Sequence, residues 1–158
     1  FIGSDGNGVM LVENDDLRPA SAYYAITGDV ARRVPAPDGG LQVSTVAGSS
    51  TPVKVQPVTL SALAGSYSAL NRDNTVANFV IQANGTIAAG SSACAVNGNI
   101  QGNSTIVGAL PLTVVLKGCG SADGTYHGYV LKASEYAPAA FRLVGENAVS
   151  FIDMLAFQ

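Results

Sequence analysis

Hydrophobic and polar residues alternate along most of this chain, and turn-forming residues interrupt the alternation at short intervals. Gly, Asn, Asp, Ser and Pro cluster at these interruptions. Nine runs between them are rich in β-branched or aromatic residues: 8–13, 21–27, 41–46, 53–58, 76–82, 111–118, 125–133, 139–145 and 148–158. Short strands with turn chemistry at nearly every joint are typical of sandwiches and barrels. The pattern predicts an all-β fold, an antiparallel β-barrel or barrel-like sandwich of about 8–10 strands.

Helical periodicity is nearly absent. The segment "TLSALAG" can form a single turn, with Thr59 or Ser61 as its N-cap and Gly65 at its end. A second turn in "LKASEYAPAA" has to stop at Pro138, which cannot continue a helix. We therefore expect almost no α-helix.

The composition changes at "AGSSTPVKVQP". Residues 1–56 are rich in acidic residues and Gly, whereas residues 57–158 form a more regular series of strands. We expect a single β domain over 1–158, in which residues 1–56 supply the first strands of a continuous barrel, because they hold few apolar residues for a core of their own. The alternative is a sub-lobe over 1–56 beside a main barrel over 57–158.

The stretch "SSACAVNGNIQ" contains one of two cysteines and an Asn-Gly pair, which commonly forms a hairpin tip. In strand alternation, however, Cys94, Val96, Gly98 and Ile100 share one face. The pair Asn84-Gly85 has apolar runs on both sides and is the better hairpin tip. We therefore place Asn97-Gly98 inside a strand and the turn after Gln101.

Two cysteines in a chain of low charge fit an exported protein with one disulfide; the alternative is two buried thiols in a cytosolic protein. If strand 93–101 pairs antiparallel with strand 111–119, Cys94 can lie opposite Cys119. In simple alternation Cys119 falls on the wrong face, and a β-bulge at Gly118 would correct this. Such a bridge is worth about 3 kcal/mol in the chain-entropy account.

Charged residues make up 12% of the chain, and the net charge is -3 with a pI near 4.8. A nucleic-acid partner is not expected, because no basic stripe could neutralise phosphates. The basic pair Arg32-Arg33 is interpreted as a solvated turn. No run of 18 or more apolar residues exists, so no membrane-spanning helix is predicted. The start at Phe1 without Met is read as a mature or trimmed form.

Catalytic patterns are weak. His127 is the only histidine, and there is no Gly-x-Ser-x-Gly elbow, so a Ser or Cys triad has a single candidate base. The ordinary interpretation of His127 is a half-exposed histidine on a strand. We expect no enzyme activity and no cofactor.

The acidic residues Glu13, Asp15 and Asp16, with Asp5, superficially match a calcium loop, but the ligand spacing of an EF-hand is not met. A weak calcium site and a pair of hydrolytic carboxylates are the alternatives to an acidic surface loop, which we favour. The other acidic residues are interpreted as rim charges: Asp123, Glu135, Glu146 and Asp153.

The order of motifs in the second half resembles a group of uncharacterised bacterial cell-envelope proteins, many of them lipoproteins. The resemblance rests on a Leu-x-Gly-x-Tyr start, an Asn-Gly hairpin, a Cys-x-x-x-Gly strand, a second Cys and a Gly-x-Tyr-x-Gly strand: Leu63, Gly65, Tyr67, Asn84, Gly85, Cys94, Gly98, Cys119, Gly124, Tyr126 and Gly128. It implies export to the periplasm, outer-membrane surface or medium, and surface exposure would make such a protein an antigen. The start of the chain lacks the lipid-attachment Cys of the group.

A fainter resemblance is to lipocalin-type barrels, with Tyr67 in place of their Trp and Arg142 as the one counterpart of their arginine. The first functional hypothesis is a non-enzymatic exported protein that acts through contacts with a protein or host component. The second is a carrier of a small apolar ligand, or an inhibitor that uses one of three loops: 34–40, 71–74 and 120–124. The third is a hydrolase that uses His127.

Overall fold

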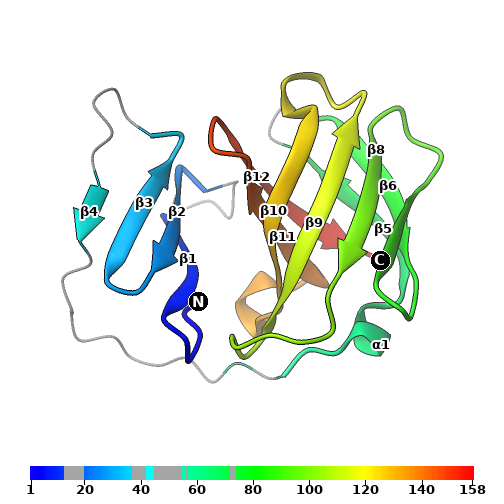
Figure 1. Ribbon diagram of the computed structural model, residues 1–158. Coiled ribbons are helices and arrows are strands. Elements are labelled where there is room, and N and C mark those ends of the chain that lie inside the picture. Colours follow the sequence, from blue (N-terminus) through cyan, green and yellow to red (C-terminus); the bar gives the residue numbers. More distant parts are fainter. Residues whose placement is uncertain (13–19, 37–41, 45–54, 56, 72–73) are drawn as a thin grey trace.

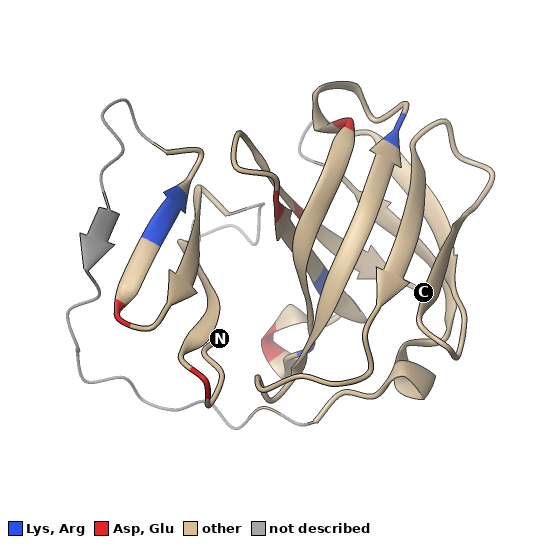
Figure 2. Ribbon diagram, viewed as in Figure 1, with Lys and Arg blue, Asp and Glu red and all other residues tan. Residues whose placement is uncertain are grey.

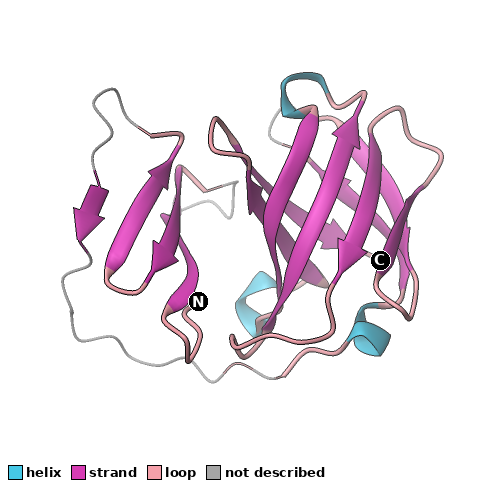
Figure 3. Cartoon of the chain, viewed as in Figure 1, coloured by secondary structure: helices cyan, strands magenta, loops and turns pink. Residues whose placement is uncertain are grey.

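The strands of this protein form two bodies, a small open sheet and a closed barrel (Figure 1). The structure is a computed structural model, and it describes residues 1–12, 20–36, 42–44, 55, 57–71 and 74–158. Within these residues it contains twelve strands, one α-helical turn and two 3-10 turns (Figure 3). The predicted all-β class, with a closed antiparallel barrel and almost no helix, is confirmed.

The small sheet has the order β1-β2-β3-β4, with every pair antiparallel. Its strands are β1 Asn7–Val12, β2 Ala22–Thr27, β3 Val30–Val34 and β4 Gln42–Ser44. These strands do not enter the barrel, so the expectation that the N-terminal part supplies the first barrel strands was wrong. Arg32 and Arg33 lie in β3 and not in a turn, because the tight turn before Val30 already reverses the chain at Gly28 (φ 58°). Of the predicted strand 53–58, the described residues lie in no strand, and the others are outside the described residues.

The barrel is closed by eight antiparallel strands that follow one another in sequence, and β12 pairs with β5 to complete the ring. A short helix α1, Leu60–Leu63, precedes it, and the 3-10 turns η1 and η2 cover Gly120–Ala122 and Ser134–Tyr136. The strands are β5 Gly65–Leu70, β6 Val76–Ile81, β7 Thr86–Ala89, β8 Ala95–Ile100, β9 Ala109–Lys117, β10 Gly124–Leu131, β11 Phe141–Glu146 and β12 Phe151–Phe157.

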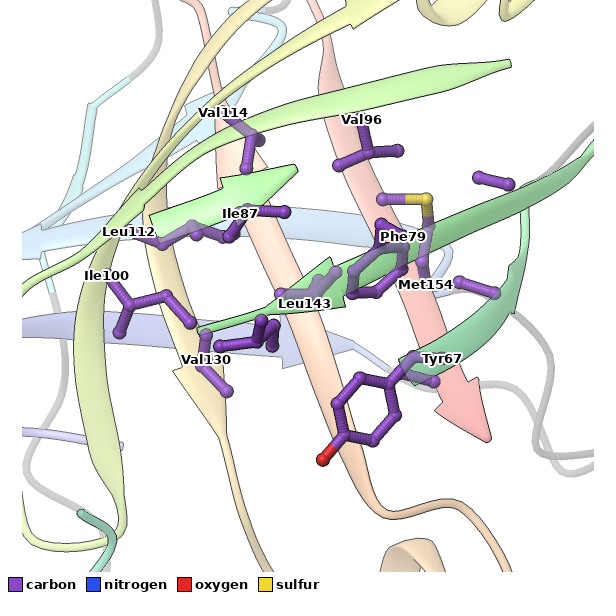
Figure 4. Close-up of a cluster of buried hydrophobic side chains, with 14 of the residues drawn as sticks. Tyr67, Phe79, Ile87, Val96, Ile100, Leu112, Val114, Val130, Leu143 and Met154 are labelled. Carbon is purple, nitrogen blue, oxygen red and sulfur yellow. The ribbon is translucent and has the colours of Figure 1, made fainter. Parts of the chain in front are cut away.

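Side chains fill the barrel interior (Figure 4). Strand alternation directs every second residue inward, and most of these residues are apolar and buried against one another. At the centre Tyr67 packs edge-on against Phe141, with ring centroids 4.6 Å apart, and lies 5.9 Å from Phe79. None of these three rings is more than 4% exposed. The interior is therefore a packed core.

The stretch that follows the first cysteine forms β8, as predicted, and Cys94 directly precedes this strand. Asn97 pairs with Val115 of β9, so the Asn-Gly pair is inside the strand, and Val96 and Ile100 face the core. Cys94 forms a disulfide with Cys119. The β9 ladder ends at Lys117, and the left-handed Gly118 (φ 69°) turns Cys119 toward its partner. Gly118 thus corrects the phase as expected, but just after the strand and not within it.

The other local predictions are also confirmed. Asn84-Gly85 lies in the hairpin between β6 and β7, closed by the hydrogen bond from Gln82 N to Thr86 O. Thr59 caps α1 by accepting from the Ala62 N–H. The second turn forms as η2 and ends before Pro138.

The small sheet packs on the outer face of the barrel at β10, β11 and β12. Val9, Tyr23 and Val34 of the sheet share a buried cluster with Leu131 and Val144 of the barrel. As a result β11 is buried on both faces, with one face in the barrel core and the other beneath the sheet. This contact positions the candidate site described below.

Candidate functional site

Within the described residues, the space for a ligand in the barrel lies at one end. A pocket of about 460 Å³ opens at the α1 end of the barrel. Tyr67 and Phe141 form its base, small side chains such as Ala62 and Ala140 form its walls, and Lys132 lies at its edge. We call it the mouth pocket. The Tyr67 hydroxyl donates to the Leu63 carbonyl oxygen at 2.9 Å, and burial raises the pKa of this phenol.

A second hollow separates the small sheet from the barrel, and we call it the intersheet groove. The two layers are in close contact where Tyr23 meets Phe151, with ring centroids 5.8 Å apart, and they diverge toward the start of β1 and the end of β2, at Asn7 and Thr27. The groove has a volume of about 570 Å³. Among the residues that line it are Asp5, Asn7, Tyr23, Thr113, His127 and Tyr129.

One row of side chains crosses three strands at the groove. His127 of β10 lies opposite Thr113 of β9 on one side and opposite Glu146 of β11 on the other. Thr113 Oγ1 is 3.1 Å from His127 Nδ1. Glu146 has other partners: Oε1 accepts from Arg32 Nη2 at 2.7 Å, and Oε2 accepts from the Ala148 N–H at 2.6 Å. The ion pair between Arg32 and Glu146 joins the sheet to the barrel.

The contact of Thr113 with His127 is that of a hydroxyl with a possible base, which is the arrangement a nucleophile needs. Acyl transfer also needs N–H donors aimed at the developing oxyanion. Thr113 lies in the middle of β9, between its ladder partners Asn99 and His127. Backbone N–H groups at such a position bond to neighbouring strands. The row is therefore suited to hydrogen bonding of a ligand more than to catalysis.

The two phenols of the groove are kept neutral by their surroundings. Burial, and then the charge of Glu146, raises the pKa of Tyr23 above its ordinary value. Burial, and then the charge of Asp5, raises the pKa of Tyr129. The carboxyl of Asp5 accepts from the Asn7 side chain and backbone N–H groups at 3.0 Å each, and these bonds lower its pKa. The groove thus presents an ionised carboxylate beside neutral hydroxyls.

The acidic residues singled out in the sequence have different environments. Glu13, Asp15 and Asp16 lie outside the described residues, whereas Asp5 lies in the groove. Within the described residues no group of three or more His, Cys, Asp or Glu side chains is close enough to hold a metal ion.

Three of the expected rim charges have structural partners: Glu146, which is paired with Arg32, and also Asp153 and Asp123. Asp153, only 1% exposed, accepts from Arg142 Nε at 2.6 Å and from Nη2 at 2.7 Å, and also from the Ala20 N–H. It is buried because the small sheet covers β12, which strand alternation alone does not predict. Asp123 accepts from the Cys119 N–H at 2.6 Å and so fixes the loop that carries the disulfide. Glu135 is exposed in η2.

A different surface lies on the side of the barrel formed by β5 to β8. The strands β5 to β8 contain no Asp, Glu, Lys, Arg or His, and none of them is coloured as charged in Figure 2. Their outward positions are filled by Ser, Asn, Thr, Ala, Val and Leu. Four apolar side chains, each 38–49% exposed, lie on β5, on β6 and on the end of β12 that pairs with β5: Leu70, Val76, Val80 and Phe157. We call this surface the uncharged barrel face.

The sequence did not single out Tyr23, Thr113 or Tyr129 as members of a site. They come from β2, β9 and β10, and only the contact of the small sheet with the barrel brings them together. Knowledge of the strand register would have placed Thr113 beside His127, since the two are cross-strand partners. No local motif marks Tyr23.

The fold and its surfaces define the class of the protein: an antiparallel eight-stranded barrel, stapled by one disulfide, with a four-stranded sheet packed on its outside. Comparison with protein-family models, with curated proteins and with solved structures finds no match for the chain. Among the described helices, none has the length and apolar character needed to cross a membrane.

Proposed function

We propose that this protein is a non-enzymatic, exported protein of the bacterial cell envelope that acts by contact with another protein through the uncharged barrel face. The observation that carries the proposal is the combination of a filled barrel interior with exposed apolar side chains on a face without charge. The disulfide Cys94–Cys119 is compatible with export, since disulfides persist in oxidising compartments. The cell-envelope assignment rests on the resemblance of the motifs given above.

The uncharged barrel face has the composition of a protein-binding surface. The cores of such interfaces are depleted in charge and contain exposed apolar side chains. On this face Leu70 lies opposite Val76, Phe157 lies opposite Ser68, and Val80 lies opposite Ser66. The apolar side chains thus alternate with small polar ones. A partner with an uncharged surface would bury them without having to desolvate an ionised group.

A photo-crosslinking experiment tests this proposal. The photoreactive residue p-benzoylphenylalanine is placed at Val80, on the uncharged face, and separately at Thr125, which is exposed on β10 on another side of the barrel. The variants are irradiated in the cells that produce the protein. We expect a discrete crosslinked partner from position 80 and none from position 125.

Two results would contradict the proposal. One is the absence of any crosslink from position 80, and the other is the same set of crosslinks from both positions. A crosslink to a second copy of the chain, confirmed by sedimentation, would make the face a self-association surface instead. The double substitution of Val76→Lys and Val80→Lys should abolish the crosslinks from a probe placed at Leu70, whereas Thr125→Lys should leave them intact.

The mouth pocket favours the alternative function, a carrier of a small apolar ligand. Its walls are mainly alanine, and Lys132 at the edge could pair with an acidic end of the ligand. Native mass spectrometry of the purified protein tests this function. The carrier predicts a co-purified mass that Ala140→Phe removes by filling the pocket, while the substitution of Ala88 to Phe, on the barrel exterior, leaves it in place. A protein without bound mass in its wild-type form contradicts the carrier.

A further inference from the structure

We infer that the intersheet groove is a binding site for an uncharged carbohydrate. This inference concerns a different surface from the uncharged barrel face and does not depend on the proposed function. It rests on three features of the groove: its shape, a buried phenol that faces it, and the balance of neutral and charged groups along it.

The shape comes from the way the two layers meet. The barrel-facing side of the small sheet is apolar and tightly packed at Leu11 and Tyr23, and becomes polar at Asn7 and Thr27. The opposing barrel strand β10 changes in the same direction, from buried Leu131 through Tyr129 to exposed His127. The layers therefore form a wedge that is dry at its base and open at its polar end. Its volume of about 570 Å³ lies in the usual range for ligand sites.

The phenol of Tyr23 lies at the base of the wedge and faces the groove. Tyr23 is 2% exposed, and its ring is held by stacking on Phe151. No hydrogen bond between described residues engages its hydroxyl, which lines the groove and is not sealed from it. A hydroxyl that opens on the groove can both donate to and accept from a ligand, and a ligand that buried it without a hydrogen bond would lose about 1–3 kcal/mol. Because its pKa is raised, it remains a neutral donor and acceptor.

The other groups of the groove are mostly neutral and come from both layers. Hydroxyls and amides that both donate and accept line it on the barrel side: Gln101, Asn103, Ser104, Thr105 and Thr113. Asp5 is the carboxylate at the open end, fixed in orientation by its two bonds from Asn7. The second carboxylate, Glu146, is already bonded to Arg32 and to the Ala148 N–H.

The balance of neutral and charged groups in the groove favours one class of ligand over the others. An anion is disfavoured, because Asp5 repels it and Arg32 is paired with Glu146. An apolar ligand would leave the hydroxyls and amides without partners, which costs about 1–3 kcal/mol for each buried group. A small cation would satisfy Asp5 but not the amides. A carbohydrate has hydroxyls that donate to Asp5 and both donate to and accept from the neutral groups, and its apolar C–H face can pack on Tyr129.

A glycan array tests the inference. The labelled full chain is applied to an array of neutral oligosaccharides built from hexoses and N-acetylhexosamines, with sialylated oligosaccharides as the acidic comparison. Titration calorimetry then measures the affinity for the strongest neutral oligosaccharide. Tetramethylammonium serves as the cationic probe in the same calorimeter. We expect binding of neutral glycans, with weaker or no binding of the acidic ones and of tetramethylammonium.

Two substitutions locate the site. Tyr23→Phe removes only the buried hydroxyl and keeps the stacked ring, and we expect an affinity loss of about tenfold. The matched control is Tyr24→Phe, the next residue in β2, whose side chain points to the other face of the sheet and does not line the groove. It should leave the affinity unchanged. Asp5→Asn, at an exposed position, gives a second test if Tyr23→Phe fails to fold, again with a loss of about tenfold.

The inference is overturned by either of two outcomes. The first is that no neutral oligosaccharide binds, whether or not tetramethylammonium does. The second is that a neutral oligosaccharide binds but neither Tyr23→Phe nor Asp5→Asn lowers the affinity relative to Tyr24→Phe.

Discussion

The buried ion pair of Arg142 and Asp153 makes a quantitative test of how the small sheet and the barrel are joined. The pair lies on the outer face of the barrel beneath the small sheet, with side chains 5% and 1% exposed. Two charge-assisted hydrogen bonds connect the two residues. The Arg142 guanidinium also lies 5.4 Å from the Tyr136 ring centroid, and Asp153 accepts from the Ala20 N–H at the start of the sheet.

The expected magnitudes follow from what each substitution leaves behind. Arg142→Met leaves the Asp153 carboxylate buried without its cation, and Asp153→Leu leaves the guanidinium without its anion. Each single substitution should therefore lower the free energy of unfolding by about 3–5 kcal/mol. The double substitution leaves no buried charge and one unpaired N–H at Ala20, so it should cost only about 1–3 kcal/mol. The double variant is thus expected to be more stable than either single variant.

Urea unfolding followed by circular dichroism measures these free energies at neutral pH. For a chain of this length a loss of 3–5 kcal/mol corresponds to a fall in Tm of roughly 6–20 °C, which differential scanning calorimetry would detect. The control is Arg33→Met, which removes an arginine from β3 and should change the free energy by less than about 0.5 kcal/mol. Single variants that lose less than about 1 kcal/mol, or a double variant that loses the sum of the two, would refute the reasoning.

Three further predictions use other parts of the molecule. Replacing Cys94 and Cys119 together by Ala should cost about 3 kcal/mol, since the bridge closes a loop of 25 residues; an unchanged urea midpoint would contradict this. Gly98→Ala puts a methyl group against the Thr113 carbonyl oxygen and should cost about 1–3 kcal/mol, whereas Gly102→Ala, whose nearest neighbour is 3.3 Å away, should be nearly neutral in the same assay. Because the pKa of Tyr23 is raised in the folded state, the unfolded state loses this proton first, and stability should fall as the pH rises above 10.0. Tyr23→Phe should reduce this loss of stability, measured as the fall in Tm at high pH. An identical pH dependence of Tm in both proteins would exclude Tyr23 as its cause.

Much of the barrel could be predicted from the sequence because its signals are local. Alternation gave β6 and β8 to β12 within a few residues, and β7 was implied only as one apolar flank of the Asn84-Gly85 hairpin, which follows from turn chemistry. Alternation also placed Asn97 inside β8. The strands β3 and β5 were not predicted, because the neighbouring residues disturb the alternation of polar and apolar positions in each. Two arginines interrupt β3, and β5 follows directly on the turn α1.

The candidate site was much less predictable. His127 was recognised as the single histidine, but its neighbour Thr113 depends on the register of β9 against β10. Tyr23 looked like an ordinary strand aromatic. The burial of its ring at the base of the groove arises from the position of the small sheet, which no residue pattern specifies.

The sequence by itself determined the all-β class, the inward and outward faces of the barrel strands, and the cysteine pair. These features depend on the two-residue period of a strand and on turn residues, which act within a few positions along the chain. Only the tertiary structure decided that the N-terminal strands form a separate sheet, and that this sheet buries Asp153. It also decided that Tyr23 of the sheet and His127 of the barrel line the same groove. These features depend on contacts between residues more than 100 positions apart, such as Ala20 with Asp153 and Arg32 with Glu146, and local periodicity carries no information about which distant faces will meet.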